Sequence, residues 1–251
     1  MSDAGEAERA RIRTEYQRRA REIPRDFYAL TTPANLFLRQ DQERSFVELL
    51  HQSGLVPMRG RRVLDLGCGD GGWLGFFQSL GVEASDIAGL DLDPARVNEA
   101  QARFPLAQLR AGSAEALPWP DGSFDVVSQV TMFTSILDRA MQERIAREML
   151  RVLKPGGAVL WLDFVYDNPK NRNVKGLKAK RVQALFPGCT ITTRSCTLAP
   201  PLARRLVGLS WGLSFALQQL RFLNTHVAAL IQRPVEAAAG PRDSGRQDHV
   251  R

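Results

Sequence analysis

The sequence predicts an α/β fold: a doubly wound, mostly parallel sheet of about seven strands with an antiparallel edge strand. From Arg62 onward, short apolar runs alternate with helix-like segments, which is the order of a parallel sheet with helical crossovers. A glycine-rich turn at 65–72, DLGCGDGG, ends the first of these runs. We also expect N-terminal helices before the sheet and a helical insert near the C-terminus.

Two helices are expected before the first strand. The first runs from Glu6 to about Arg25 and is rich in charge, and Thr31-Thr32-Pro33 breaks it. The second covers 34–53 with an apolar face, and Gly54 ends it. We expect residues 1–58 to form a helical cap that folds as a lid over the ligand site. The residues that we expect to face that site are Tyr28, Asn35, Phe37 and Gln40.

The central part, 59–165, holds five expected strands joined by helices. The strands are expected at 63–66, 87–92, 106–111, 124–130 and 158–165. Helices are expected from about Gly72, after Asp93-Pro94 and over 138–153. Asp93 followed by proline is a favourable helix start, because aspartate caps the first turn and proline suits its first position. Lys154-Pro155-Gly156-Gly157 is expected to make the turn before the fifth strand.

The C-terminal part, 166–234, is expected to complete the sheet. Two further strand candidates, 190–198 and 226–232, suit an edge hairpin. They flank a very apolar segment, 200–224. A helix that is apolar on nearly every face is usually buried, so we expect this segment in the core. The alternatives are a substrate-pocket wall and an interfacial surface anchored by Trp211 and arginines. The tail, 235–251, lacks apolar periodicity and is expected to be disordered.

Composition and charge point to a globular protein with two electrostatically different parts. Of the 251 residues, 44% are hydrophobic and 24% charged. Residues 63–165 carry 8 Lys/Arg against 14 Asp/Glu, whereas residues 166–251 carry 14 against 4. A basic block of this kind attracts phosphate-bearing substrates, nucleic acid or anionic membrane. It is also compatible with a merely solvated face.

The cysteines and the N-terminus carry no further signal. The three cysteines, Cys68, Cys189 and Cys196, lack the spacing of a disulfide framework or a metal site. The N-terminus is polar, and no stretch of about twenty apolar residues occurs. We therefore expect no metal and a soluble cytoplasmic protein, with peripheral contact at the inner face of the membrane as an alternative.

The glycine-rich turn stands where the first strand passes into a helix. In a Rossmann-like sheet this is the switch-point crevice in which ligands bind. Glycines allow a tight turn and let a ligand approach the backbone closely. Gly67, Gly69 and Gly72 also satisfy the dinucleotide pattern GxGxxG, so the turn alone leaves nucleotide binding and simple turn-making open.

Four blocks together resolve that ambiguity. They are VLDLGCGDGGW (63–73), GLDLDPARV (89–97), GSAEALPWPDGSFDVVSQV (112–130) and LKPGGAVLWLDF (153–164). In this order, the segment from Val63 to about Val165 resembles the class I S-adenosylmethionine-dependent methyltransferase family, with a methyltransferase type 11-like domain. A nicotinamide enzyme accounts for the first two blocks and leaves the other two unexplained.

The resemblance implies S-adenosyl-L-methionine as cofactor and assigns residues to it. Asp65 is implied to meet the methionine ammonium, and Asp91 to accept from the ribose hydroxyls. Leu92 is implied to pack on the adenine, whose edge meets the backbone N–H of Ala114. The implied cofactor-binding set is Asp65, Gly67, Cys68, Gly69, Asp91, Leu92, Ser113, Ala114, Glu115 and Gln129. An unliganded Asp65 inside an apolar strand is hard to explain, because burying an unpaired carboxylate costs several kcal/mol.

The acceptor is less well specified. An alcohol acceptor needs a base, for which Asp163 and Asp167 are candidates, although either equally suits a hydrogen-bonded loop acid. No histidine is an obvious base, and His226 is interpreted as structural. The fourth strand ends without the Asn/Asp-Pro-Pro-aromatic sequence that marks many family members acting on amino groups.

Three functions follow as hypotheses. The first is O-methylation of a small molecule or of a glycan or natural-product intermediate, including a lipid-linked one. The second is RNA methylation through the basic block, which lacks the interleaved aromatics typical of RNA-binding surfaces. The third is a non-catalytic binding protein with this fold, against which the intact Asp65, glycines and Asp91 argue.

Overall fold

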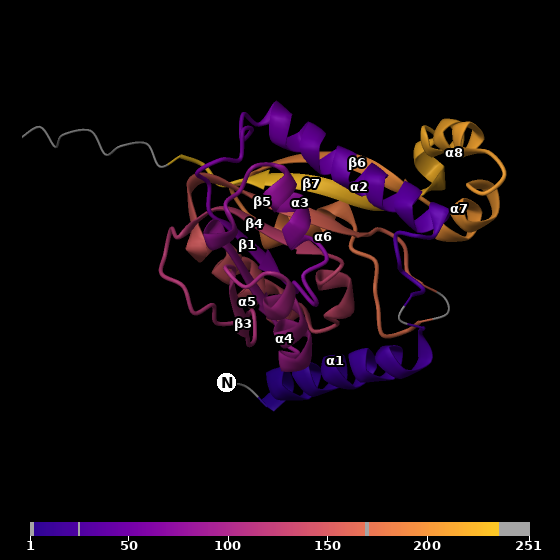
Figure 1. Cartoon of the computed structure of the whole chain (residues 1–251). Helices are drawn as coiled ribbons and strands as arrows, with labels where there is room; N and C mark the ends of the chain where they lie inside the picture. Colours follow the sequence, from indigo (N-terminus) through magenta and orange to yellow (C-terminus); the bar gives the residue numbers. More distant parts are fainter. Residues whose placement is uncertain (1–2, 25, 169–170, 236–251) are drawn as a thin grey trace, which may run out of the picture.

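A seven-stranded sheet forms the centre of the protein, with the order β3-β2-β1-β4-β5-β7-β6 (Figure 1). The computed structural model describes residues 3–24, 26–168 and 171–235, and the side chains from Gly5 onward. The strands are β1 Val63–Leu66, β2 Ile87–Asp91, β3 Gln108–Ala111, β4 Phe124–Val130, β5 Leu153–Phe164, β6 Thr190–Leu198 and β7 Asn224–Gln232. The strands from β1 to β5 pair in parallel, while β7 is antiparallel to β5 and β6. The predicted doubly wound sheet with an edge hairpin is confirmed.

Helices cover both faces of the sheet. They are α1 Asp3–Glu22, α2 Pro33–Gln52, α3 Leu74–Ser79, α4 Pro94–Arg103, α5 Arg139–Val152, α6 Ala179–Leu185, α7 Pro200–Leu206 and α8 Trp211–Gln218. Strand residues alternate between two apolar clusters, as the period of a strand requires. Val63 packs on one face with Phe46 of α2 and Phe77 of α3. Leu64 packs on the other face with Ile145 of α5.

The strand order reverses at β1, which lies between β2 and β4. At such a reversal the crossover helices leave to opposite faces, so a crevice opens beyond the carboxyl ends of the strands. The helix that follows β2 begins as predicted, because the Asp93 side chain accepts a hydrogen bond from the N–H of Ala95 at 2.9 Å. The glycine turn after β1 and the acid at the end of β2 therefore meet at one edge of the sheet.

The fifth strand begins earlier than predicted. Lys154–Gly157 was expected as a turn, but β5 already starts at Leu153. Leu153 pairs with Phe124, and a register shift follows before Val126 pairs with Ala158. The residues of the expected turn thus belong to a longer strand, and they cause a shift in its register near its start.

The two N-terminal helices occupy different places (Figure 1). Helix α1 lies apart from the sheet across its ligand-binding edge, and Ile12 packs against the main cluster. Helix α2 lies along β6 and β7. Phe37 of α2 packs with α7, and the Asn35 side chain donates to the carbonyl oxygen of Phe27 at 2.8 Å. Of these two helices, only α1 lines the cavity at the ligand-binding edge, so the expectation that Tyr28, Asn35, Phe37 and Gln40 face the ligand site is wrong.

The expectation that 200–224 lies in the core is wrong. Trp211, Leu213 and Phe215 of α8 are 41%, 50% and 45% exposed. The segment projects beyond the end of the sheet (Figure 1), so large parts of it are not covered by the sheet. There Ala203 of α7 and Val207, directly after it, join a small cluster with α2. The expected disordered tail, apart from Val235, lies outside the described residues.

Candidate functional site

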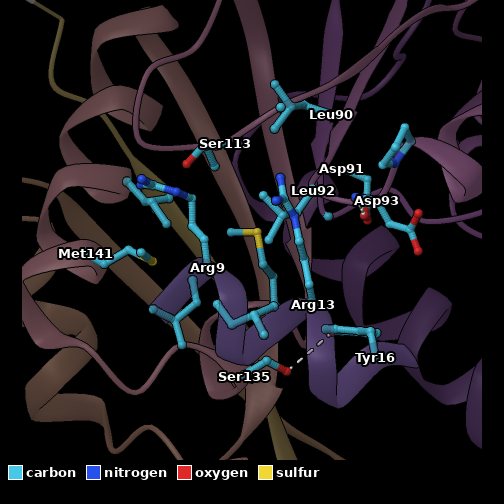
Figure 2. A pocket seen from close by; sticks show the side chains of 18 of the residues that line it. Arg9, Arg13, Tyr16, Leu90, Asp91, Leu92, Asp93, Ser113, Ser135 and Met141 are labelled. Atoms are coloured by element: carbon cyan, nitrogen blue, oxygen red, sulfur yellow. Dashed lines mark hydrogen bonds between the residues drawn. The ribbon is translucent and has the colours of Figure 1, made fainter. Parts of the chain in front are cut away.

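A cavity of about 280 Å³ opens beyond the carboxyl ends of β1, β2 and β4, beneath α1. Its floor comes from the sheet edge and the loops that follow the strands, and its roof from α1 (Figure 2). Floor residues include Gly67, Leu90, Asp91, Leu92, Asp93, Ser113, Ala114, Val130 and Met132. Roof residues are Arg9, Ile12, Arg13, Tyr16 and Gln17. The floor thus contains five of the ten predicted cofactor residues.

The glycine turn needs its glycines. Gly67 and Gly69 have φ values of +71° and +56°, a region that other residues adopt at a cost. The N–H of Gly67 donates to the carbonyl oxygen of Leu90 at 2.8 Å, which ties the turn to the end of β2. A Cβ on Gly67 would lie 3.2 Å from Cγ of Met132, across the cavity floor. The backbone of Gly67 therefore faces the cavity directly, and a side chain at this position would narrow the cavity.

Asp91 joins the glycine turn to the cavity. Its Oδ2 accepts from the N–H of Gly69 at 2.9 Å, and its Oδ1 accepts from the N–H of Asp93 at 2.9 Å. Two backbone donors orient the carboxylate, which lines the cavity. The predicted convergence of the turn and this acid on one crevice is what the structure shows.

Asp65 lies behind the turn and is 2% exposed. Its Oδ1 accepts from the Ser128 hydroxyl at 2.6 Å. Burial raises the pKa of Asp65 to about 7, and the negative charge of Asp91 raises it further, against that hydrogen bond. A cationic group bound nearby would favour the charged form of Asp65. The residue does not itself line the cavity.

Two arginines that the sequence analysis missed flank the turn. The Arg39 guanidinium of α2 stacks 3.4 Å from the Trp73 ring and donates to the carbonyl oxygen of Gly72 at 2.9 Å. Its positive charge lowers the pKa of Asp65. The Arg96 guanidinium lies against Gly69, where an added Cβ would be 2.1 Å from its Nη2. The position of Arg96 one turn into the helix after Asp91 was the available signal.

Past the end of β3, Ser113 and Ala114 line the cavity but Glu115 does not, although the Ser113 hydroxyl donates to Oε2 of Glu115 at 3.2 Å. Leu92 also lines the cavity. Glu115 instead forms ion pairs with Arg9 and Arg144. Burial alone would raise the pKa of Glu115, but hydrogen bonds from Arg144 and Arg9 lower it below its usual value. Glu115 therefore holds α1 in place.

Gln129 and Asp163 belong to one buried network. The Gln129 amide nitrogen donates to Oδ2 of Asp163 at 3.1 Å, and its oxygen accepts from the N–H of Met132 at 3.1 Å. The Thr134 hydroxyl donates to Oδ1 of Asp163 at 2.7 Å. Burial raises the pKa of Asp163 to about 7 against these hydrogen bonds. The network holds the loop that carries Met132, and neither Gln129 nor Asp163 lines the cavity.

The remaining predicted residues lie away from the cavity. Asp167 is exposed and accepts from the N–H of Gly176 at 2.9 Å. Cys68 is buried, and burial raises the pKa of its thiol. His226 is buried against the Phe164 ring, and burial lowers its pKa to about 3, so it is neutral. Within residues 3–24, 26–168 and 171–235, no group of three His, Cys, Asp or Glu side chains could hold a metal ion.

The roof is attached mainly by polar contacts. Oε1 of Glu8 accepts from the N–H of Leu137 at 2.6 Å, and Arg11 donates to the carbonyl oxygen of Ser135 at 2.6 Å. The Tyr16 and Ser135 hydroxyls lie 3.4 Å apart across the cavity mouth (Figure 2). Glu15 accepts from the side-chain amides of Asn171 and Asn173 at 3.0 and 2.8 Å. Such contacts can open and re-form in water at modest cost.

The part of the chain around this cavity is similar to known methyltransferases. Residues 63–157 match the family described as methyltransferase domain. A probable S-adenosylmethionine-dependent methyltransferase of Mycolicibacterium smegmatis is 35% identical over 45% of this chain and 42% of its own length. A fatty-acid O-methyltransferase of the same organism is 32% identical over 57% and 53%. A ubiquinone/menaquinone biosynthesis C-methyltransferase of Yersinia enterocolitica is 35% identical over 42% and 43%.

Solved structures share the fold. A putative sarcosine dimethylglycine methyltransferase from Galdieria sulphuraria superposes with a TM-score of 0.58, at 20% identity, over 78% of this chain and 86% of that one. The chain spans about half the length of the curated relatives that it matches. The family match at 63–157 contains the glycine turn, Asp91 and the loops of the cavity floor.

Proposed function

We propose that this chain, which contains a class I S-adenosylmethionine-dependent methyltransferase domain, transfers the methyl group to an oxygen of a small molecule or glycan-type intermediate. The observation that carries the proposal is the hydrogen bond from Gly69 to Asp91 at the floor of the cavity. It brings the turn and the acid of the two leading motifs into one site.

The residues present fit the cofactor. S-adenosylmethionine carries a sulfonium and an ammonium, and the site offers carboxylates in Asp91 and, behind the turn, Asp65. The raised pKa of Asp65 is that of a buried acid which a cation would stabilise in its charged form. The adenine needs an apolar slot, and Leu92, Ile136 and Ile145 line the same cavity.

We assign the cofactor groups to these residues. Asp91 would accept from the ribose hydroxyls, and its two backbone donors hold its carboxylate in position for this. Leu92 and the N–H of Ala114 would hold the adenine. Asp65 would stabilise the ammonium. Arg96, beside Gly69 and 3.9 Å from Oδ2 of Asp91, would meet the methionine carboxylate.

Little further chemistry is required of the protein. When bound, the cofactor supplies an electrophilic methyl group for an in-line displacement. The chain has to hold the acceptor in line and exclude water, which by itself accounts for a large part of such a rate enhancement. Met132 and Ile136 of the floor and Ile12 of the roof make the cavity apolar where the acceptor would enter.

Asp163 and Asp167 are the candidate bases for an alcohol acceptor, and the positions of both argue against that role. Asp163 lies behind the loop of Met132, and Asp167 is held at the surface by Gly176. Direct proton transfer to Asp163 requires that loop to move. We expect Asp163→Asn and Asp167→Asn each to keep more than about a tenth of the turnover, which fits an acceptor that needs little base assistance. Turnover below about a hundredth in either variant would establish it as the base.

RNA methylation is the alternative, and the basic block supports it weakly. Arg181 is engaged by Glu143 and by the side chain of Gln142, and Arg194 by Glu48. Cations already paired within the chain are less available to phosphates. An RNA substrate would show affinity that falls steeply with salt, at a slope set by the phosphates contacted. A small-molecule acceptor would show little salt dependence.

The test is transfer of labelled methyl from S-adenosylmethionine to fatty acid, phenol and glycan acceptors, and to RNA at two salt concentrations. We expect product from one of the small-molecule classes, and loss of that product in Asp91→Ala. Label in RNA alone would contradict the proposal. Cofactor binding without transfer to any of these acceptors would leave the binding-protein hypothesis as the better one.

A further inference from the structure

The insert between β6 and β7 stands out from the rest of the molecule. It comprises α7, α8 and a 3₁₀ turn at Arg221–Leu223, and it extends beyond the end of the sheet (Figure 1). It is anchored where Ala203 and Val207 pack against Ala34 and Phe37 of α2. The insert also exposes large apolar side chains, namely Leu209, Leu213, Leu220 and Phe222. Trp211 and Phe215 are partly exposed too, and they also contact Phe37 and Arg44 of α2.

Helix α8 has its polar and apolar faces reversed. Ser214 and Gln218 are 0% and 6% exposed, whereas Leu213 and Phe215 are about half exposed. The Ser214 hydroxyl donates to the carbonyl oxygen of Ser210 at 2.9 Å, and Asn224 donates to the carbonyl oxygen of Gln218 at 3.0 Å. A helix in water normally presents the opposite arrangement. An exposed apolar area of this kind is typical of a surface that binds a membrane or another protein.

The linker between α1 and α2 continues this surface. Phe27, Tyr28 and Leu30 are 41%, 64% and 50% exposed. The Arg204 guanidinium of α7 lies 4.5 Å above the Phe27 ring, so the linker and the insert are in contact. We call residues 27–30 together with 199–223 the apolar surface. It ends at the linker through which the cavity roof, α1, connects to the rest of the chain.

The charge of the apolar surface distinguishes two possible partners, a second copy of this chain and an anionic lipid surface. Residues 199–223 carry Arg204, Arg205 and Arg221 and no acidic residue. The longer stretch 168–235 carries 11 Lys/Arg and no Asp/Glu. A second copy joined by a two-fold axis would bring these arginines against one another. An anionic lipid surface would instead attract them while burying the aromatic side chains.

We propose that the apolar surface docks on an anionic phospholipid bilayer, with Leu209 and Phe222 below the headgroups and the arginines among them. Leu209 and Phe222 are the most exposed, at 82% and 74%. No helix in the described parts of the chain is long and apolar enough to cross a membrane, so the contact would be peripheral. The proposal does not depend on methyl transfer, since it concerns a surface away from the cavity.

The test is flotation of the purified chain with phosphatidylglycerol vesicles and with phosphatidylcholine vesicles. We expect binding to the first that weakens at high salt, and at least about 10-fold weaker binding to the second. The double variant Leu209→Ser/Phe222→Ser should lose at least about 10-fold in vesicle affinity. Its thermal midpoint and S-adenosylmethionine affinity should match wild type, which separates this result from misfolding and from the proposed function.

Leu106→Ser is the matched control. Leu106 is 69% exposed, but it precedes β3 at the opposite edge of the sheet from β6. The Leu106→Ser variant should bind vesicles as tightly as the wild type does. Equal loss in this control, or absence of wild-type binding to phosphatidylglycerol vesicles, would overturn the proposal. A concentration-dependent dimer in sedimentation velocity that the double variant abolishes, without vesicle binding, would assign the surface to a second copy instead.

Discussion

The floor and the roof of the cavity are built by different forces. The floor rests on the ends of β1, β2 and β4, whose side chains are packed in the two main apolar clusters. The roof, α1, is rich in charge and rests on ion pairs and hydrogen bonds to Glu115, Ser135 and Leu137. Apolar packing gives a rigid support, whereas polar contacts can be exchanged for contacts with water at modest cost. A rigid floor therefore keeps its shape, while the roof helix α1 is held by contacts that can open to admit a ligand.

The largest expected effect comes from the floor. Gly67→Ala places a Cβ 3.2 Å from Met132 at a φ of +71°. We expect S-adenosylmethionine affinity to fall by about 100-fold, or about 2.7 kcal/mol, as measured by calorimetry. The control is Gly122→Ala, which has a similar φ of +62° and no atom within 4 Å of the added Cβ. It should lose stability similarly, by about 1 kcal/mol, and keep its affinity. Equal affinities in both variants would show that the floor tolerates side chains.

The next effect is a pH dependence set by Asp65. Burial raises the pKa of its carboxyl to about 7, so the carboxylate that suits an ammonium predominates only above that value. Cofactor affinity should therefore rise by about 10-fold from pH 6 to pH 8. Asp65→Asn should bind more weakly at pH 8 and remove this dependence. Asp163→Asn is the control, because Asp163 has a similarly raised pKa away from the cavity and should leave the profile unchanged.

A smaller effect is expected from the roof. Arg9→Ala removes the ion pair between α1 and Glu115, so α1 should open more often. We expect the cofactor to dissociate about 3- to 5-fold faster, in line with a partly buried pair worth about 1 kcal/mol. Stopped-flow displacement measures this rate. Arg18→Ala is the matched control, because Arg18 pairs only with Glu15 and Glu22 of the same helix among the ion pairs described. An equally fast release in that variant would mean that helix stability, rather than the contact to Glu115, closes the roof.

The smallest effect concerns stability at the floor. Thr131 follows β4 with a φ of +54°, which a β-branched residue adopts only under strain. Thr131→Asn should raise the free energy of unfolding by about 0.5–1 kcal/mol, because asparagine tolerates this conformation. Chemical denaturation measures the change. A destabilised variant would show that the Thr131 side chain makes a contribution larger than its strain.

The sequence was most informative where local pattern and packing agree. The strand that ends in Asp91, the cap at Asp93 and the edge hairpin of 190–198 and 226–232 all follow from short-range periodicity and turn chemistry. The motif residues on the cavity floor could be predicted because the backbone geometry of the strand ends allows few residue types there. Gly67 and Asp91 face the cavity because both lie at the carboxyl end of a strand, where the crevice of such a sheet opens.

Predictions were weaker where a residue's role depends on its partner. Glu115 was assigned to the cofactor, but Arg9, more than a hundred positions away, engages it. Gln129 was assigned likewise, but it pairs with Asp163. The apolar pattern of α8 suits burial in protein, and only the place of the insert at the end of the sheet leaves Trp211, Leu213 and Phe215 exposed. Long-range pairing of this kind is not encoded in local sequence.

Isothermal titration of S-adenosylmethionine into wild type, Asp91→Ala and Asp70→Ala tests the central claim most directly. Asp70 belongs to the same turn but is exposed and pairs with Arg103. We expect micromolar binding by wild type and Asp70→Ala, and at least about 30-fold weaker binding by Asp91→Ala, since two charge-assisted hydrogen bonds would be lost. Undetectable binding by wild type, or equal affinity in the two variants, would contradict the assignment of this crevice to the cofactor.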